Sequence, residues 1–289
     1  MTQKTQVGII GSGPAGLLLS QLLHVNGIES IVLEKYSRAH VEGRIRAGIL
    51  EQGTVDILET AKVAKRLHQE ALTHTGIGLL FNDTLHRIDF NEQSTGKSVT
   101  VYGQTDITKD MMDAHADRGQ EPVYLAKDVQ IDGLESDSPS IRYTHNGDPY
   151  KIECDFVVGC DGYHGVSRKS FPENFLNIYE KIYPFGWLGV LADVAPVSDE
   201  LIYNSHPDGF ALASQRSKTR SRYYIQCDLN EKLEAWSDDR FWETLTHRFG
   251  NEVGQHIETG PSIEKSIAPL RSFVAEPMRY KSLFLAGDA

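Results

Sequence analysis

The segment Val7-Gly8-Ile9-Ile10-Gly11-Ser12-Gly13-Pro14-Ala15-Gly16 decides how this chain folds. A short apolar run ends in three glycines spaced as G-x-G-x-x-G, and an apolar run with helical periodicity follows over residues 17–23. A second apolar run, Ser30-Ile31-Val32-Leu33, ends at Glu34. The order strand, tight turn, helix, strand and acid is typical of a βαβ unit that binds a dinucleotide.

Each glycine has a separate role in such a turn. Gly11 permits the tight bend, Gly13 lets the backbone approach a pyrophosphate, and Gly16 lets the helix pack closely on the strand. The start of the helix then offers free N–H groups and the positive end of the helix dipole. Glu34 follows Gly16 by 18 residues (34 − 16 = 18), near the distance expected for the acid that accepts from ribose hydroxyls. The alternative is a turn that requires glycines only for its backbone conformation. It does not explain why a strand, a helix and an acid stand at the spacing of a dinucleotide-binding unit.

The composition limits the classes of protein that fit. The chain has 289 residues, 40% of them hydrophobic and 24% charged, as expected for a globular protein of one large domain or two smaller ones. Its net charge of −11 argues against general nucleic-acid binding, which requires a basic surface. No apolar stretch approaches the length of a membrane span, so we expect no membrane partner.

The cysteines indicate the compartment. Cys154, Cys160 and Cys227 are an odd number in a long chain, which fits a reducing cytoplasm and burial as small apolar residues. Their spacing matches no zinc pattern, so no metal is expected. The first strand follows directly after residues 1–6, which leaves no room for a signal peptide. We therefore expect a cytoplasmic protein.

Three polar loops beyond the first unit suit contact with the same ligand. Arg44-Ile45-Arg46-Ala47-Gly48-Ile49 carries two arginines next to glycines, which suits a second phosphate site as well as a solvated loop. Gln104 precedes Thr105, the predicted cap of a helix that ends at Gly119, and ligands of open α/β sheets collect at such junctions. Another apolar strand ends at Asp161-Gly162, which by itself is typical of a turn before a capped helix.

The character of the sequence changes after Tyr183. Three strands with turn-rich connections are predicted over residues 200–203, 210–215 and 221–228, and they favour an antiparallel meander. A helix with one apolar face follows, with Ser237 as its cap and Gly250 as its stop.

The chain is therefore predicted to be α/β, with a Rossmann-like βαβ domain and a second domain built on a mainly antiparallel sheet. Other short strands are expected at residues 77–81, 85–88, 98–101, 123–126, 141–143, 151–153 and 283–286. The predicted limits are 1–180 for the first domain, 181–265 for the second and 266–289 for a return to the first, with 74–100 as a candidate addition to the second. A buried parallel strand such as 283–286 is normally followed by a covering helix, so we expect a longer natural protein.

Three signatures then stand in order along the chain: residues 11–16, Cys160-Asp161-Gly162 with Arg168, and Leu285-Ala286-Gly287-Asp288. Together they resemble the flavoprotein aromatic hydroxylases. The resemblance implies that the first segment binds the ADP half of FAD and that the Asp-Gly segment serves both FAD and the nicotinamide cofactor. It also implies that the Gly-Asp segment holds the ribityl and pyrophosphate region.

Within that family, the similarity extends to the members that hydroxylate 4-hydroxybenzoate and covers essentially the whole chain. It is carried by residues 44–53, 101–105, 183–189, 214–217 and 266–272. It implies hydroxylation of 4-hydroxybenzoate at the 3-position to 3,4-dihydroxybenzoate, with NAD(P)H and O2 consumed, through a flavin C4a-hydroperoxide. It also implies a homodimer, and a polypeptide that continues past Asp288.

The resemblance assigns a substrate site to the second unit. Arg216 is the expected clamp for the substrate carboxylate, and Ser214, Gln215 and Tyr224 are expected to contact the same molecule. Tyr203 is the expected partner of the substrate phenol. His74 is expected to relay the phenol proton to solvent. Without the resemblance, the alternatives are a solvated basic turn, an amphipathic tyrosine and a structural histidine.

The resemblance also assigns residues to the two nucleotides. The expected FAD contacts are Gly11, Gly13, Ala15, Gly16, Glu34, Arg44, Ile45, Arg46, Ala47, Gly48, Ile49, Gln104, Asp161, Arg222 and Asp288. The expected nicotinamide-nucleotide contacts are Lys35, His40, His164 and Arg271, with Arg46 as a further candidate. Lys35, Arg38 and His40 follow the ribose acid and can meet a 2′-phosphate, which favours NADPH over NADH.

Three other functions remain open from the sequence. The first is a related hydroxylase of another aromatic acid such as 3-hydroxybenzoate. The second is a non-enzymatic binding protein on the same fold, against which the intact glycines, Glu34 and Gly287-Asp288 argue. The third is an NAD-dependent dehydrogenase that uses the first motif alone, which leaves the Asp-Gly and Gly-Asp segments unexplained.

Overall fold

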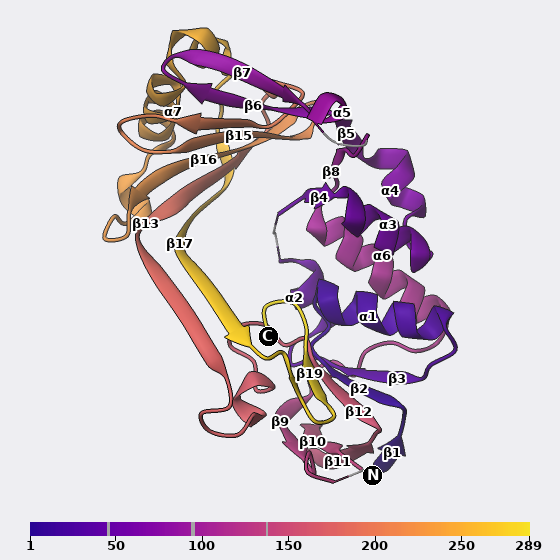
Figure 1. Ribbon diagram of the computed structural model, residues 1–289. Coiled ribbons are helices and arrows are strands. Elements are labelled where there is room, and N and C mark those ends of the chain that lie inside the picture. Colours follow the sequence, from indigo (N-terminus) through magenta and orange to yellow (C-terminus); the bar gives the residue numbers. More distant parts are fainter. Residues whose placement is uncertain (45–46, 94–95, 137) are drawn as a thin grey trace.

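The computed structural model describes residues 1–44, 47–93, 96–136 and 138–289. Figure 1 shows two units joined by the long strands β13 (Asn177–Ala192) and β17 (Ser262–Glu276). Both termini lie in the lower unit, the N-terminus at its base and the C-terminus near α2 (Arg38–Glu42). Among the described residues, no helix has both the length and the apolar character needed to cross a membrane.

The lower unit is built on a five-stranded sheet in the order β18-β19-β12-β2-β3. Its strands are β2 (Val7–Ile10), β3 (Ser30–Leu33), β12 (Phe156–Gly159), β18 (Arg279–Tyr280) and β19 (Leu283–Leu285). Strands β3, β2, β12 and β19 run parallel, and α1 (Pro14–Val25) connects β2 to β3. The predicted βαβ unit is confirmed. The strand predicted at 123–126 is wrong, because only Val123 forms a bridge, to Leu33.

Four further helices cover this unit: α2 (Arg38–Glu42), α3 (Gln52–Thr60), α4 (Lys65–Glu70) and α6 (Gln104–Asp117), while the short α5 (Phe90–Gln93) lies beside the upper unit. Gly103 is the N-cap of α6, which corrects the prediction that Thr105 caps it. The hydroxyl of Thr105 donates instead to the carbonyl of Arg44, at 3.2 Å. This bond ties the start of α6 to the loop over 44–49.

Two further sheets are present: in Figure 1 one lies below the first sheet, and the other lies above α6, where the two units meet. One has the order β1-β11-β10-β9 and the other β4-β8-β5. Their strands are β1 (Thr2–Lys4), β9 (Lys127–Asp132), β10 (Ser140–His145), β11 (Asp148–Glu153), β4 (Ile49–Glu51), β8 (Val99–Val101) and β5 (Leu72–His74). Short 3-10 helices occur at η1 (Arg168–Ser170), η2 (Leu233–Ala235) and η3 (Gly254–His256).

The upper unit is a seven-stranded sheet in the order β17-β13-β16-β15-β14-β6-β7. Its other strands are β6 (Gly76–Phe81), β7 (Thr84–Asp89), β14 (Ile202–Ser205), β15 (Ala211–Ser217) and β16 (Arg220–Asp228). The meander β14-β15-β16 is antiparallel, as predicted. The hairpin β6-β7 joins it through a parallel pairing of β6 with β14, so residues 76–89 belong to this sheet.

Helix α7 (Asp238–Val253) covers one face of this sheet. Its start is capped by Ser237, whose hydroxyl accepts from the backbone N–H of Arg240. Phe241, Leu245 and Phe249 are fully buried, and each contributes about 1.5–3 kcal/mol through burial. They pack in one cluster with the inward residues of the sheet, among them Tyr223. The opposite face of the sheet is therefore free to line a site.

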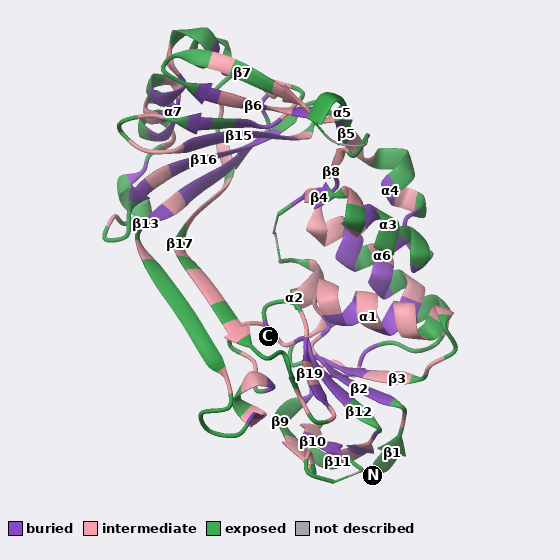
Figure 2. Ribbon diagram, in the orientation of Figure 1, coloured by how far each residue is buried: buried purple, intermediate pink, exposed green. Residues whose placement is uncertain are grey.

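Strands β13 and β17 pair over most of their length and carry the chain between the two units. Figure 2 shows that β13 is buried within the upper sheet and exposed between the units, whereas β17, at the edge of the sheet, is only partly buried along its length. The domain limits predicted at residues 180 and 265 fall inside these two strands. Each strand runs without a break from one unit to the other, so neither limit coincides with the end of a strand.

Candidate functional site

The glycine turn is closed toward the protein and open toward solvent. Gly11 has φ +105°, and a Cβ there would strike the carbonyl of Cys160. A Cβ on Gly16 would strike the carbonyl of Gly11. A Cβ on Gly13, in contrast, would meet nothing within 4 Å. The turn thus leaves free space at the position where a pyrophosphate would approach the backbone, which fits the ADP half of FAD.

Glu34 is held in place at the end of β3. Its Oε2 accepts from the backbone N–H of Ser12 at 2.8 Å and from the Ser12 hydroxyl at 3.0 Å. Its Oε1 accepts from the N–H of Tyr36 at 2.9 Å. Each carboxylate oxygen has two lone pairs, so one position on Oε1 remains for a ribose hydroxyl. The buried carboxylate is oriented before any ligand arrives.

A cavity of 220 Å³ lies between α1, the 47–50 segment and α6. Five residues predicted to contact FAD line it: Ala15, Ala47, Gly48, Ile49 and Gln104. The loop and the helix are fixed to each other, because the N–H of Gln104 donates to the carbonyl of Ala47 at 2.9 Å. The predicted contacts Ile45 and Arg46 lie outside the described residues. The side chain of Arg44 is exposed beside them.

The other two signatures lie at the ends of neighbouring parallel strands. Asp161 follows β12, and its Oδ2 accepts from the N–H groups of Val166 and Ser167 at 2.6 and 3.0 Å. Its Oδ1 is buried without a hydrogen-bond partner. Asp288 follows Gly287, and a Cβ on Gly287 would lie 3.1 Å from the Cβ of Ala15. The fold therefore brings the Gly-Asp segment against the glycine turn.

Three of the predicted substrate residues, Tyr203, Ser214 and Tyr224, share one face of the upper sheet, whereas Gln215, the neighbour of Ser214 on β15, belongs to the other face. In the register of the strands, Tyr203 pairs with Leu212, and Leu212 pairs with Tyr224. Ser214 pairs with Arg222, one step further along the same face. Side chains alternate between the two faces of a strand, so these positions all lie opposite the face that Tyr223 shares with the core.

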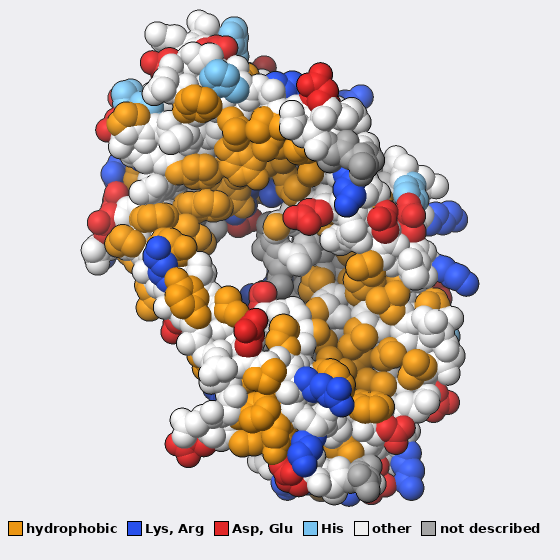
Figure 3. Space-filling model, in the orientation of Figure 1, with side chains coloured by type: hydrophobic (Ala, Val, Ile, Leu, Met, Phe, Trp, Pro, Cys, Tyr) orange, Lys and Arg blue, Asp and Glu red, His pale blue; other side chains and the backbone are white. Residues whose placement is uncertain are grey.

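Aromatic rings form one wall of this face. The rings of Trp187 and Phe210 stack with centroids 5.2 Å apart, and Trp187 lies 5.7 Å from Tyr224. Tyr203 is 38% exposed, with its ring 6.3 Å from that of Phe210. Figure 3 shows hydrophobic side chains gathered on the upper unit where it borders the hollow between the units. Such a wall suits a planar aromatic ring.

Two arginines place positive charge beside the aromatic wall. Arg216 reaches from β15 to the loop of the lower unit, where a Cβ on Gly48 would lie 3.4 Å from the Arg216 Cζ. Its Nη1 is buried without a hydrogen-bond partner. Burial lowers the pKa of Arg216, and the neighbouring Tyr224 opposes that shift. A buried guanidinium N–H without an acceptor is costly, so this position favours an anionic ligand.

Arg222 is the second cation and has an acidic neighbour. It is 8% exposed, and its Nη1 lies 3.2 Å from the Oε2 of Glu264 on β17. Its guanidinium stands 5.1 Å from the centre of the Tyr224 ring. Gly189 makes room for both side chains, because a Cβ there would lie 2.8 Å from Tyr224 and 3.0 Å from Arg222.

Glu264 was not identified from the sequence. The signal that could have identified it is the alternation of faces along a strand. Glu264 and Ser266 lie on one face of β17 and Lys265 on the other, and β17 pairs with β13. Leu191 pairs both with Arg222 and with Glu264, which puts the acid on the face of the substrate residues. Two cations and one carboxylate leave this group with one excess positive charge.

His74 lies at the junction of the two units, 2% exposed. Burial lowers its pKa, and the neighbouring Gln215, Glu200 and Asp199 oppose that shift. Neither ring nitrogen has a hydrogen-bond partner within the described residues. The structure thus places His74 beside Gln215, a predicted substrate residue that is itself buried.

The predicted nicotinamide-nucleotide residues fall in two groups, each around a tyrosine. Lys35 lies over the ring of Tyr36 at 5.5 Å, and His40 stacks on the same ring at 4.3 Å. The ring of His164 lies 4.9 Å from that of Tyr163, over which the guanidinium of Arg271 stands at 4.6 Å. Tyr36 and Tyr163 were not among the residues predicted to contact the nicotinamide nucleotide. Each is next in sequence to a residue that was predicted, Lys35 and His164.

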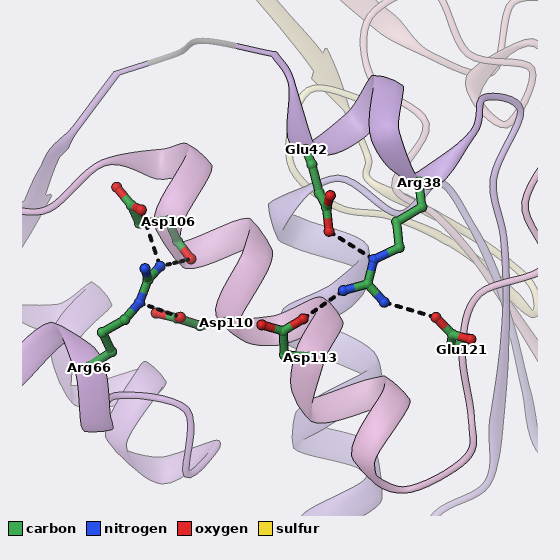
Figure 4. Close-up of polar contacts among 7 residues, drawn as sticks. All are labelled: Arg38, Glu42, Arg66, Asp106, Asp110, Asp113 and Glu121. Atoms are coloured by element: carbon green, nitrogen blue, oxygen red, sulfur yellow. Dashed lines mark hydrogen bonds and ion pairs between the residues drawn. The ribbon is translucent and has the colours of Figure 1, made fainter.

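Arg38 is not free to meet a phosphate. Figure 4 shows its guanidinium surrounded by Glu42, Asp113 and Glu121, at 2.8, 2.6 and 2.9 Å. These carboxylates raise the pKa of Arg38, with Glu42 the largest cause. Because three carboxylates already pair with Arg38, Lys35 and His40 are the better placed of the three predicted residues to meet a 2′-phosphate.

Comparison with known proteins matches this geometry. A model of the family described as FAD binding domain matches residues 4–289. The p-hydroxybenzoate hydroxylase of Acinetobacter baylyi is 57% identical over 288 residues, which cover 100% of this chain and 71% of that protein.

Two solved structures share the fold. The p-nitrophenol 4-monooxygenase PnpA of Pseudomonas putida DLL-E4 superposes with a TM-score of 0.80 at 17% identity, over 99% of this chain and 73% of that one. PqsL of Pseudomonas aeruginosa, described as a probable FAD-dependent monooxygenase, superposes with a TM-score of 0.82 at 17% identity, over 99% of this chain and 79% of that one.

Proposed function

From the premise that this chain belongs to the FAD-binding family of flavoprotein aromatic hydroxylases, we propose how its residues act on 4-hydroxybenzoate. The enzyme is an FAD-dependent monooxygenase that converts 4-hydroxybenzoate to 3,4-dihydroxybenzoate. One NADPH, one proton and one O2 are consumed, and NADP+ and one water are released. One oxygen atom enters the ring and the other leaves as water.

The observation that carries this proposal is the excess positive charge beside an aromatic wall. Arg216 and Arg222 face one carboxylate, that of Glu264, among the described residues of this face. An aromatic monocarboxylate supplies the missing negative charge and a ring for the wall of Trp187 and Tyr224. The carboxylate is placed at Arg216, where a guanidinium can hold it through two parallel hydrogen bonds.

The remaining substrate residues follow from the register. With the carboxylate at Arg216, the hydroxyl of Ser214 lies on the same strand and can donate to it. The phenol end of the ring then points along the face toward Tyr203, which is exposed on β14. A tyrosine hydroxyl can both accept and donate, so Tyr203 can take the phenol proton and favour the phenolate. A phenolate is the more electron-rich ring and reacts faster with an electrophilic oxygen.

We assign each part of the cofactor site from the residues whose geometry fits a part of FAD. The turn at Gly13 and the carboxylate of Glu34 hold the ADP half of FAD, and the cavity lined by Ala15 and Gln104 holds a further part of it. Bound FAD supplies hydride acceptance from NADPH and transfer of oxygen from O2. The chain positions the ring, holds its charge and excludes water. His74 passes the phenol proton onward.

Two further statements belong to the same proposal. We infer a homodimer, supported by the family resemblance, and light scattering after gel filtration tests it.

We also infer a cytoplasmic location. It is supported by three free cysteines, all buried, and burial raises the pKa of Cys154 to about 11 and that of Cys160 to about 12, as expected for inert thiols.

The proposed substrate is tested by NADPH oxidation with the FAD-loaded enzyme. Oxidation should accelerate on addition of 4-hydroxybenzoate and yield 3,4-dihydroxybenzoate. The same amount of 3-hydroxybenzoate, whose phenol points away from Tyr203 when its carboxylate is held at Arg216, should yield less product. A higher product yield from 3-hydroxybenzoate would overturn the assignment.

A further inference from the structure

We propose that His206, Asp208 and His247 form a binding site for a divalent transition-metal cation such as Zn²⁺, on the surface of the upper unit. One ligand atom of each residue lies within 4.8 Å of the others. The site is separate from the substrate face and from the cysteines. It revises the expectation, drawn from cysteine spacing, that the protein has no metal site.

The distances between the ligand atoms suit one small cation. Asp208 Oδ2 lies 3.0 Å from His247 Nε2 and 3.8 Å from His206 Nδ1. Two ligand atoms that each lie about 2.1 Å from a tetrahedral zinc ion are about 3.4 Å apart. The observed separations lie on either side of that value, so a cation would need only small side-chain movements. Two imidazoles with one carboxylate form a donor set that suits Zn²⁺, Cu²⁺ and Ni²⁺.

The ligands come from two elements that are already fixed to each other. His206 and Asp208 lie in the turn between β14 and β15, and His247 lies on α7. The buried side chain of Asn204 donates to the carbonyl of Arg248, at 2.5 Å. The guanidinium of Arg248 donates in return to the carbonyl of Phe210, at 3.1 Å.

The local hydrogen bonds set the state of the two imidazoles: His247 Nε2 donates to Asp208 Oδ2 at 3.0 Å and would give up that proton when a cation binds. The N–H of Asp208 donates to His206 Nδ1 at 3.1 Å, so this nitrogen carries no proton and presents the lone pair that a metal requires. A bound cation would displace this N–H from His206 Nδ1. The N–H is exposed, so it would then donate to water. The side chains of Asp208 and His247 are each 64% exposed, so the cation can enter from solvent.

A cation here would link the turn to the helix. The turn follows directly after β14, which carries Tyr203, and α7 covers the opposite face of the sheet. The metal would therefore brace the sheet that presents the substrate residues, without touching the substrate. Because a ligand that binds only the folded state stabilises it, Zn²⁺ should raise the melting temperature by a few degrees.

The test is titration of the FAD-loaded enzyme with ZnCl2 by calorimetry, combined with thermal melting. We expect one saturable ion per chain. His206→Ala and His247→Ala should each weaken binding at least about tenfold and remove the rise in melting temperature. His256→Ala is the matched control, since His256 is an exposed histidine on the neighbouring η3 and should leave both readouts unchanged.

The three variants alter surface side chains, so circular dichroism should report the parental fold for each. The proposal is overturned if no saturable binding is seen. It is also overturned if the His206 and His247 variants bind Zn²⁺ as tightly as the parent.

Discussion

Replacing Arg216 by alanine tests the assignment of the substrate carboxylate. The guanidinium lies at the meeting of the sheet face and the FAD cavity, with Nη1 buried and unpaired. A hydrogen bond to a charged group contributes about 1.5–3 kcal/mol. Arg216→Ala should therefore raise the Kd for 4-hydroxybenzoate by about one to two decades.

The same geometry predicts what the variant leaves unchanged. In the free enzyme the buried Nη1 of Arg216 has no acceptor, so removal of the guanidinium should leave the melting temperature close to that of the parent. FAD content should also remain at the parental level. A loss of folding would instead show that the buried guanidinium is structural.

The assay is titration of the flavin spectrum with 4-hydroxybenzoate. Arg220→Ala is the matched control, because Arg220 begins the next strand, β16, pairs with Asp193 at 2.7 Å and has an exposed side chain. Its variant should bind substrate like the parent. Equal affinities for the Arg216 variant and the parent would refute the clamp and place the carboxylate elsewhere.

Three further changes separate the cofactor turn, the phenol partner and the charge balance. Gly13→Val should give a folded protein without FAD, because the new side chain points into the open space of the turn; stoichiometric flavin in the purified variant would refute the role of the turn. Tyr203→Phe should bind substrate and reduce the flavin but form less 3,4-dihydroxybenzoate per NADPH, with H2O2 making up the difference; a parental ratio measured by chromatography would reduce Tyr203 to a packing role. Glu264→Gln removes the one carboxylate beside Arg222 and should tighten 4-hydroxybenzoate about threefold or more, while neutral 4-hydroxybenzamide binds unchanged. Equal shifts for both ligands would contradict the electrostatic reading.

The parts of the fold that could be predicted are those set by local sequence. The glycine turn and the cap at Ser237 each follow from a few neighbouring residues, and the structure has both. The strands predicted over 200–203, 210–215 and 221–228 placed Tyr203, Ser214 and Tyr224 on successive strands. This prediction could not show which face would be covered, since that depends on α7, which follows later in the chain.

The remaining features depend on contacts between distant segments. The pairing of Arg38 could not be predicted, because its partners Asp113 and Glu121 lie 75 and 83 residues further along the chain. Glu264 reaches the substrate face only through the pairing of β17 with β13. Strand 123–126 has a suitable composition, but only one of its residues pairs. No local pattern reports such pairings.

The most direct test of the central claim is the origin of the oxygen in the product. The FAD-loaded enzyme is supplied with NADPH, 4-hydroxybenzoate and ¹⁸O2 in unlabelled water, and the product is examined by mass spectrometry. The account predicts 3,4-dihydroxybenzoate with one ¹⁸O atom, formed in a ratio near one to the NADPH consumed. Unlabelled product, or NADPH oxidation that yields only H2O2 with 4-hydroxybenzoate bound, would contradict it.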